Sequence, residues 1–123
     1  MANDFKRFVK KDIGTGEGAS GSTVYTVPAG AGSSALESIV IGITIANKST
    51  AGITCDVFID ALGGATDDVY VVKDASIPAG SSLEVMSGNK LVLMNTGSAG
   101  DVLKMTSSTA SAADGIVSVL EDV

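Results

Sequence analysis

The sequence predicts an all-β protein, an antiparallel β-sandwich of about eight strands that is either jelly-roll-like or Ig-like and carries an extended N-terminal arm. Apolar residues alternate with a period of two in several segments. These segments are short, and clusters of Gly, Ser, Asn and Asp separate them at the spacing of a sandwich. From residue 22 onward, no stretch of ten or more residues shows sustained helical periodicity.

The expected strands follow one another to the end of the chain, and their number suits two packed sheets. They cover residues 22–28, 36–46, 52–60, 67–74, 81–86, 89–94, 101–107 and 115–121. The apolar share of 45% is made mainly of small branched side chains, while aromatic residues are only 4%. Such a composition favours strands over helices.

The segment SIVIGITIA has the clearest alternation. Ile39, Ile41, Ile43 and Ile45 fall on one face by strict period two, and the opposite face carries small residues. We therefore expect the isoleucine face to lie in the core.

Two further segments suggest contacts between subunits. In ITCDVFID, Phe58 points outward among acids, where it packs under the arm or against a neighbouring subunit, or is a single exposed apolar residue of the ordinary kind. In the last strand, Val117 and Val119 alternate with other mostly apolar residues, which indicates a central strand or an intersubunit contact. Phe58, Val117 and Val119 are therefore the candidate oligomer contacts.

The two prolines of the chain share one context, TVPAG ending at Gly30 and SIPAG ending at Gly80. Proline lacks the amide hydrogen that a strand ladder needs, so each PAG string is expected to end a strand and turn the chain. A Ser pair, a Leu-Glu pair and an apolar run ending at Asn47 or Asn95 follow each string. This similarity indicates either an internal duplication or convergent turn chemistry.

The chain divides into an N-terminal arm with a hinge, residues 1–21, and a sandwich domain, residues 22–123. The net charge is −6, but residues 1–12 carry +2, and GTGEGASG at 14–21 reads as a hinge. The arm is expected to bind a partner as a short amphipathic helix or a docking strand; the alternative is a disordered terminus. The candidate partner-binding residues are Phe5, Lys6, Arg7, Phe8, Val9, Lys10 and Lys11.

The amino-acid composition disfavours catalysis, metal binding and nucleic-acid binding. The sequence has no histidine and a single cysteine, Cys55, so the usual general base and a thiolate zinc site are both missing. Asp56, Asp60, Asp67 and Asp68 cluster but do not follow the ligand spacing of a calcium loop. We expect no enzyme activity, no catalytic residues, no metal and no cofactor. The acidic body disfavours nucleic acid.

The N-terminal residues do not form a secretory signal, and no run approaches the roughly 20 apolar residues of a membrane span. We therefore expect a soluble protein, made in the cytoplasm, with no membrane contact.

Four stretches of the sequence resemble a known class of proteins. They are VYTVPAG, the long Ile/Val strand ending in IAN, YVVKDASIPAGSSLEVMSGNKLVLMNTG and SSTASAADGIVSVLEDV. In this order they resemble small virion structural proteins of tailed bacteriophages, especially marine and cyanobacterial ones. The resemblance covers residues 22–123. It implies a β-sandwich that assembles symmetrically, often as a trimer, on a capsid surface or at the neck or tail, with no catalytic residues.

The resulting expectation is a capsid decoration or cement protein that grips the shell through its N-terminal arm and self-associates. The expected partners are the major capsid protein, or neck and tail proteins, together with further copies of this chain, and the expected location is the virion. A neck, tail or fibre adaptor is the alternative. A carbohydrate- or receptor-binding module is a further alternative, in which Tyr25 or Tyr70 would contact the ligand.

Overall fold

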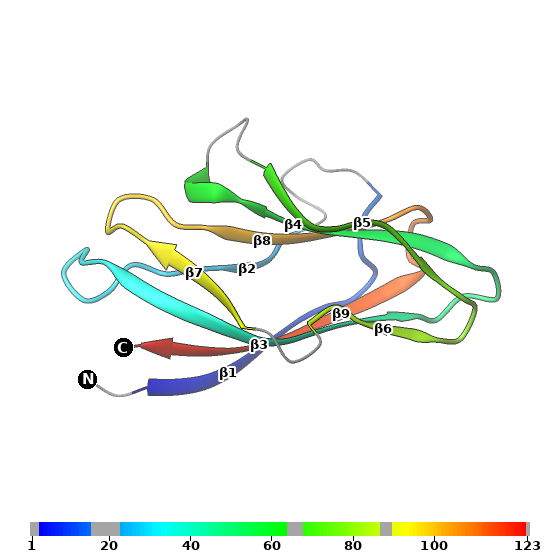
Figure 1. Ribbon diagram of the computed structural model, residues 1–123, viewed down its shortest axis with the longest axis horizontal. Coiled ribbons are helices and arrows are strands. Elements are labelled where there is room, and N and C mark those ends of the chain that lie inside the picture. The colour runs from blue at the N-terminus through cyan, green and yellow to red at the C-terminus, as the bar shows by residue number, and fades with distance from the viewer. Residues whose placement is uncertain (1–2, 16–22, 64–67, 87–89, 123) are drawn as a thin grey trace.

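The computed structural model describes residues 3–15, 23–63, 68–86 and 90–122, and these form two antiparallel sheets packed face to face (Figure 1). The first sheet has the order β1-β9-β3-β6, with β7 also paired to β3, and the second has the order β2-β8-β4-β5. The strands are β1 (Asn3–Lys10), β2 (Thr23–Thr26), β3 (Leu36–Asn47), β4 (Ile53–Asp60), β5 (Asp68–Ile77), β6 (Ser82–Glu84), β7 (Leu91–Asn95), β8 (Val102–Ser107) and β9 (Ala113–Asp122). The predicted β-sandwich is confirmed. The described residues contain no α-helix, only a 3-10 turn at Ala61–Gly63.

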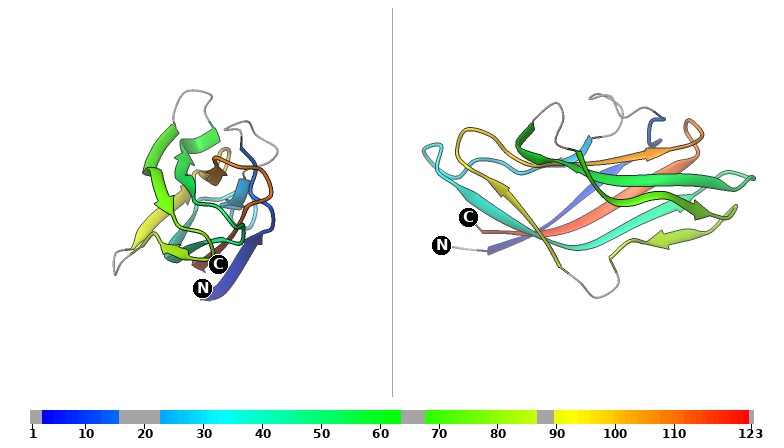
Figure 2. Two further views of the ribbon diagram at one scale, coloured as in Figure 1. Left: turned by 90° about the vertical axis from the view of Figure 1, so that its right-hand side faces the viewer. Right: turned by 45° about the horizontal axis from the view of Figure 1, so that its top comes forward.

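Each of the eight predicted strands corresponds to one strand of the structure, and the largest differences lie at strand ends. β5 continues to Ile77 instead of ending at residue 74, and β9 begins at Ala113 instead of residue 115. A ninth strand, β1, lies in the segment predicted as an arm. It pairs with β9 along its whole length, from Asn3 opposite Asp122 to Lys10 opposite Gly115. Asn3–Lys10 is therefore an edge strand of the first sheet and not a segment apart from the sandwich, as Figure 2 also shows.

β3 contains a bulge that changes which isoleucines face the core. Val40 pairs with Val119 and Gly42 pairs with Ser118, so Ile41 is an additional residue in β3. A bulge inverts the alternation on its far side. Ile43 and Ile45 are consequently buried as predicted, but Ile39 and Ile41 lie on the other face, where Ile39 is partly exposed and Ile41 is exposed, so the prediction of a single buried isoleucine face was wrong for these two residues.

The central core lies between the two sheets. It is built mainly from small branched side chains, among them Val24, Val27, Leu36, Val40, Ile43, Ile45, Ile53, Val57, Ile77, Leu93, Leu103, Met105, Val117 and Val119. Because many of these side chains are fully buried, truncation of any one would remove apolar contacts that the neighbours cannot fully restore.

The two proline strings form corners that buried asparagines hold in the same way. The Asn47 amide donates hydrogen bonds to the carbonyls of Ile77, at 3.0 Å, and Pro78, at 3.2 Å. The Asn95 amide donates to the carbonyl of Val27, at 2.8 Å. Each asparagine therefore fixes the proline string of the other half of the chain.

The two corners differ in their glycines. Gly80 has a φ of 71°, and Ser81 donates its amide hydrogen to the Pro78 carbonyl across this turn. Gly30 differs because its backbone is closely approached: a Cβ there would lie 2.5 Å from the Ser34 hydroxyl oxygen and 3.1 Å from the Ala35 carbonyl oxygen. The positive φ values of the first corner occur instead at Gly32 and Ser33. Equivalent strings thus form corners with different local conformations.

The strand order has the symmetry expected of a repeated unit. In the second sheet, β2 and β5 are the two edges, and β8 and β4 lie between them as an antiparallel pair. In the first sheet, β3 and β7 also pair antiparallel. Exchanging β2 with β5, β3 with β7 and β4 with β8 leaves these pairings unchanged. This partial symmetry is consistent with the duplication interpretation, although the pairing of β3 with β9 has no counterpart at β7.

Candidate functional site

The outer face of the first sheet carries a row of apolar side chains that crosses four strands. Phe5 on β1 lies opposite Leu120 on β9, Leu120 lies opposite Ile39 on β3, and Ile39 lies opposite Val92 on β7. Phe5 is 78% exposed and Val92 is 58% exposed, while Ile39 and Leu120 are partly exposed. Directly opposed residues lie on the same side of a sheet, so these four form a continuous surface row.

Further apolar side chains of the same sheet widen this row into a patch. Val9 lies opposite Ile116, and both are about half exposed, as are Ile41 and Met94. We call the resulting surface the outer apolar face. It consists of Phe5, Val9, Ile39, Ile41, Val92, Met94, Ile116 and Leu120. Contiguous apolar surface of this kind usually marks an interaction site on a folded protein.

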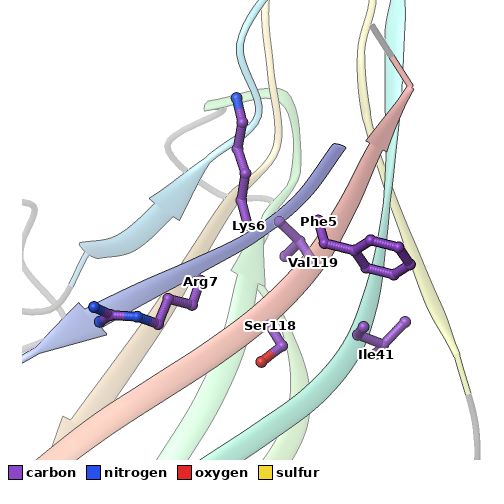
Figure 3. A pocket seen from close by; sticks show the side chains of 6 residues that line it. All are labelled: Phe5, Lys6, Arg7, Ile41, Ser118 and Val119. Atoms are coloured by element: carbon purple, nitrogen blue, oxygen red, sulfur yellow. The ribbon is translucent and has the colours of Figure 1, made fainter. Parts of the chain in front are cut away.

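An open hollow lies within the outer apolar face. Phe5, Arg7, Ile41 and Ser118 are among the residues that line it. Figure 3 shows the ring of Phe5 extending from β1 over β9 toward Ile41 of β3, while Lys6 points to the opposite side. The β3 bulge directs Ile41 outward. The bulge therefore interrupts the apolar alternation of β3 and also helps to form this hollow.

The inner side of β1 is fixed to the sandwich by a buried acid. The Lys6 ammonium lies 2.8 Å from a carboxylate oxygen of Glu121, which is 1% exposed. The other carboxylate oxygen accepts a 2.6 Å hydrogen bond from the Tyr25 hydroxyl of β2. The Phe8 ring packs on Tyr25 with centroids 4.5 Å apart. Lys6 and Phe8 thus hold β1 in place. Phe8 is half-buried by this contact, whereas the Lys6 side chain stays 43% exposed.

These contacts shift the pKa values of Glu121 and Tyr25. Burial raises the pKa of Glu121, but the hydrogen bonds from Lys6 and Tyr25 and the charge of Lys6 outweigh burial, so the net pKa is below the ordinary 4.5. For Tyr25, burial and the hydrogen bond to Glu121 raise the pKa of the phenol far above 10. Glu121 is therefore an anion in the folded protein at neutral pH, and Tyr25 is neutral.

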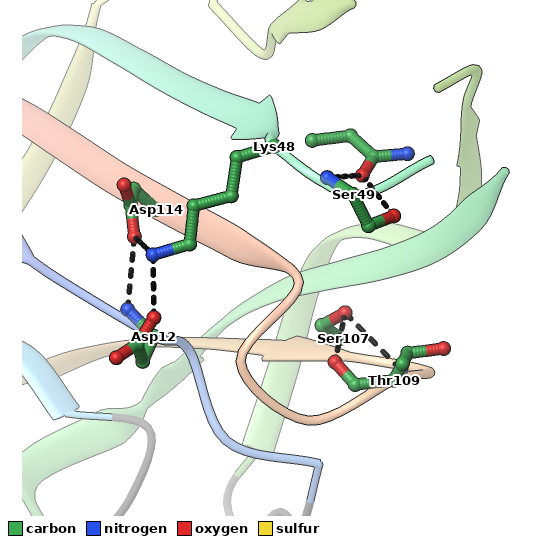
Figure 4. A network of polar contacts seen from close by, with 7 residues as sticks. Asp12, Lys48, Ser49, Ser107, Thr109 and Asp114 are labelled. Atoms are coloured by element: carbon green, nitrogen blue, oxygen red, sulfur yellow. Dashed lines mark hydrogen bonds and ion pairs between the residues drawn. The ribbon is translucent and has the colours of Figure 1, made fainter. Parts of the chain in front are cut away.

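The chain that leaves β1 is anchored by a second polar cluster (Figure 4). Asp12 has a φ of 57°, donates its amide hydrogen to the Asp114 carboxylate at 2.9 Å, and forms an ion pair with Lys48. Lys48 also lies 2.9 Å from Asp114. Next along the chain, Ile13 is fully buried and donates its amide hydrogen to the Ala113 carbonyl. Residues 12–14 are therefore a fixed part of the domain; the rest of the predicted hinge, residues 16–21, lies outside the described residues.

The remaining candidate partner-binding residues are exposed to different degrees. Phe5, Arg7 and Val9 lie on the outer side of β1, and all three are exposed. Lys11 is exposed beyond the end of the strand, and Lys10 is half-buried. Of the seven residues singled out by sequence, Phe5, Arg7, Val9 and Lys11 remain the best placed for a partner.

The three predicted oligomer contacts are all buried within one chain. The outward position predicted for Phe58 was wrong, but for the last strand the structure agrees with the alternative of a central strand, because β9 lies between β1 and β3. Val117 and Val119 point into the central core, because they alternate with the outward-facing Ile116 and Ser118. Phe58 is outside that core cluster but is fully covered, with its ring 5.1 Å from that of Tyr70. The exposed apolar residues of the last strand are instead Ile116 and Leu120, which sequence alternation alone did not distinguish from the valines.

Two acids of the second sheet, Asp56 and Asp60, have structural partners. Asp56 accepts hydrogen bonds from the Asp74 amide, at 2.7 Å, and the Thr106 hydroxyl, at 3.1 Å. Asp60 lies 3.5 Å from the Lys104 ammonium. Across residues 3–15, 23–63, 68–86 and 90–122, no group of three or more His, Cys, Asp or Glu side chains is arranged to hold a metal ion. Asp67 lies outside these ranges.

The fold and the outer apolar face define a β-sandwich protein with one unusually apolar sheet surface. No protein-family model, curated protein or solved structure matches the chain. Within the described part of the chain, no helix is long and apolar enough to cross a membrane.

Proposed function

We propose that this chain is a non-enzymatic structural component of a bacteriophage particle, most simply a capsid decoration or cement protein. The observation that carries the proposal is the outer apolar face, which places Phe5, Ile39 and Val92 in one row across four strands. An apolar sheet surface of this extent suits attachment to another protein rather than chemistry on a small molecule. The resemblance of residues 22–123 to phage virion proteins supports the same class.

The shell protein would contact the outer apolar face, with Arg7 and Lys11 at its β1 side. This arrangement retains the idea of N-terminal attachment, but β1 acts as part of a preformed sheet instead of as a loose arm. A preformed surface loses less conformational entropy on binding than a segment that orders on contact.

Two valines of equal exposure allow a matched test of the attachment surface. Val92, on the outer apolar face, and Val69, on β5 of the second sheet, are both 58% exposed. Each would be changed to Glu in a phage that encodes this chain, and its amount in purified particles would be measured. We expect Val92→Glu to be lost from particles and Val69→Glu to be retained. Equal incorporation of both variants, with both folded, would contradict attachment through this face.

Electron microscopy of particles labelled on this protein would separate the decoration role from its alternative. Label distributed over the shell supports a decoration protein. Label confined to the neck, tail or fibres would instead support an adaptor that uses the same face.

A carbohydrate- or receptor-binding role has less support from the described residues. Tyr25 is 2% exposed and bonded to Glu121, so it cannot present an aromatic surface to a sugar. Tyr70 is partly exposed, but its ring contacts Phe58, and the Lys73 ammonium lies 4.9 Å from the ring centroid.

A further inference from the structure

β1 is a long, regular edge strand. All eight of its residues pair with β9 without a register shift, and no strand among the described residues pairs with its other side. Its outward residues include the exposed Phe5 and Val9. An edge of this kind presents a row of backbone amide and carbonyl groups to which another strand can add.

The other edge strands among the described residues are short or irregular. β2 has four residues and a register shift, β6 has three residues, and β7 has five. β5 is longer, but it has two register shifts, and Asp74 within it has a φ of 53°. Short length and bulges are the features that keep natural edges from pairing with other chains. β1 lacks both features.

Charge is the remaining protection that an edge strand can have, and on β1 it is partly neutralised. Lys6 faces inward, where a lysine normally opposes strand addition, but it forms an ion pair with Glu121. Its side chain is still 43% exposed, and an ammonium group can donate three hydrogen bonds. Asp4, two residues earlier on the same side of the strand, is exposed. The hydrogen bond and the charge of Glu121 raise the pKa of Lys6, and the charge of Asp4 adds to this effect.

We propose that β1 pairs antiparallel with β1 of a second copy of this chain over Asn3–Arg7, with Phe5 opposite Phe5 and Asp4 opposite Lys6. The two first sheets then form one continuous sheet across a two-fold axis. The pairing places two Asp-Lys pairs on the inner side and an aromatic pair on the outer side, both of which stabilise antiparallel strands.

The neighbouring registers are less favourable. A two-fold axis perpendicular to the sheet places opposite each β1 residue a residue on the same side of the sheet. One residue must therefore lie on the axis, opposite its own copy, and the next register places the adjacent residue there. Moving the axis to Lys6 or Arg7 places two like charges directly opposite each other, which is destabilising. With the axis at Phe5, the row Phe5-Leu120-Ile39-Val92 continues without interruption into the same row of the second copy.

Disulfide cross-linking tests both the contact and its register. Residues directly opposite in an antiparallel pair have Cα atoms about 4.5 to 5.5 Å apart, within the range that a disulfide spans. Purified Phe5→Cys should therefore form a covalent dimer as its main product under mild oxidation. Val9→Cys, on the same side of the same strand, should remain monomeric on a gel run without reductant. The unsubstituted chain controls for Cys55, which is buried.

Sedimentation equilibrium of the purified chain gives a second readout. We expect twice the monomer mass, and a shift toward the monomer in Asp4→Lys but not in Asp68→Lys, a matched exposed acid at the start of β5. A monomer or trimer for the unsubstituted chain would overturn the proposal, as would cross-linking through Arg7→Cys in place of Phe5→Cys.

The pairing goes beyond the proposed virion role and can fail separately from it. Both readouts use the chain without any particle. A dimer that is absent from particles would leave the pairing intact and contradict the virion role. A monomer that is still incorporated into particles would contradict the pairing and leave the virion role intact.

Discussion

The phenolic oxygen of Tyr25 lies 2.6 Å from the buried carboxylate of Glu121, and this hydrogen bond joins the two sheets beside β1. Tyr25 belongs to β2 of the second sheet, and Glu121 belongs to β9 of the first. The same phenolic oxygen lies 2.6 Å from the Ser38 hydroxyl of β3. Because Lys6 occupies the other carboxylate oxygen, the Glu121 carboxylate and the Tyr25 hydroxyl together connect three strands of the first sheet, β1, β3 and β9, to β2.

Removing the Tyr25 hydroxyl should weaken the sandwich. Tyr25→Phe keeps the ring that packs on Phe8 but leaves the Glu121 carboxylate with one hydrogen-bond donor fewer in a buried position. We expect a loss of about 1 to 3 kcal/mol in the free energy of unfolding, measured by urea denaturation. Ser118→Ala, a half-buried hydroxyl on the same strand as Glu121, serves as the control and should change the stability little. Equal stabilities for the two variants would contradict a structural role for this bond.

Stability should depend on pH through Glu121. Its pKa in the folded chain lies below the ordinary 4.5, so the contribution is fully present above pH 4.5 and is lost as the pH falls through the folded value. Asp114 adds to this loss, because the Asp12 amide and Lys48 also lower its pKa. Thermal unfolding measured between neutral and acidic pH should therefore show a stability that decreases as the pH falls below 4.5.

Substitution of Glu121 isolates its share of the pH dependence. Glu121→Gln should be less stable than the unsubstituted chain at neutral pH, because the amide cannot form the ion pair with Lys6. The difference should shrink as the pH falls, since the unsubstituted carboxylate becomes neutral as well. Glu37→Gln, an exposed acid on β3, is the matched control. A Glu121→Gln difference that stays constant with pH would show that the ion pair contributes nothing.

The two asparagines that hold the proline strings should differ in importance. The Asn47 amide contacts three backbone carbonyls, those of Ala51, Ile77 and Pro78, whereas the Asn95 amide contacts that of Val27. We expect Asn47→Ala to lose about 2 to 3 kcal/mol and Asn95→Ala about 1 to 2 kcal/mol of unfolding free energy, because each leaves a buried carbonyl without this donor and Asn47→Ala also removes two part-buried bonds. Ser82→Ala, at an exposed position of β6, is the control in chemical denaturation. A larger loss at Asn95 would contradict this ranking.

The sequence was sufficient to predict the fold class and eight strands because alternation and turn residues are local signals. It did not predict the side of each strand that is buried after an irregularity. The extra residue at Ile41 reverses the alternation of β3, and only its pairing with β9 reveals it. In the same way, Glu121 reads as an exposed acid near the chain end, and its burial depends on Lys6 and Tyr25, which are distant in sequence.

The candidate surface was predicted in part. Phe5 and Val9 were singled out because they are apolar residues in a basic segment, and both are exposed on β1. Ile39 and Val92 could not be added, since their place beside Phe5 depends on the order of four strands. No local pattern in the sequence encodes that order.

Two phenylalanines provide the clearest contrast between a predicted contact and an observed one. Phe58 is fully buried against Tyr70, whereas Phe5 is 78% exposed. Phe58→Ala should therefore cost about 3 to 5 kcal/mol of unfolding free energy, and Phe5→Ala less than about 0.5 kcal/mol, both measured by urea denaturation of dilute protein. In sedimentation, Phe5→Ala should weaken self-association while the fold persists, because Phe5 lies at the proposed two-fold axis. Phe58→Leu, which keeps much of the buried volume, should fold and associate like the unsubstituted chain. Weaker association in Phe58→Leu than in Phe5→Ala would return the oligomer contact to the second sheet.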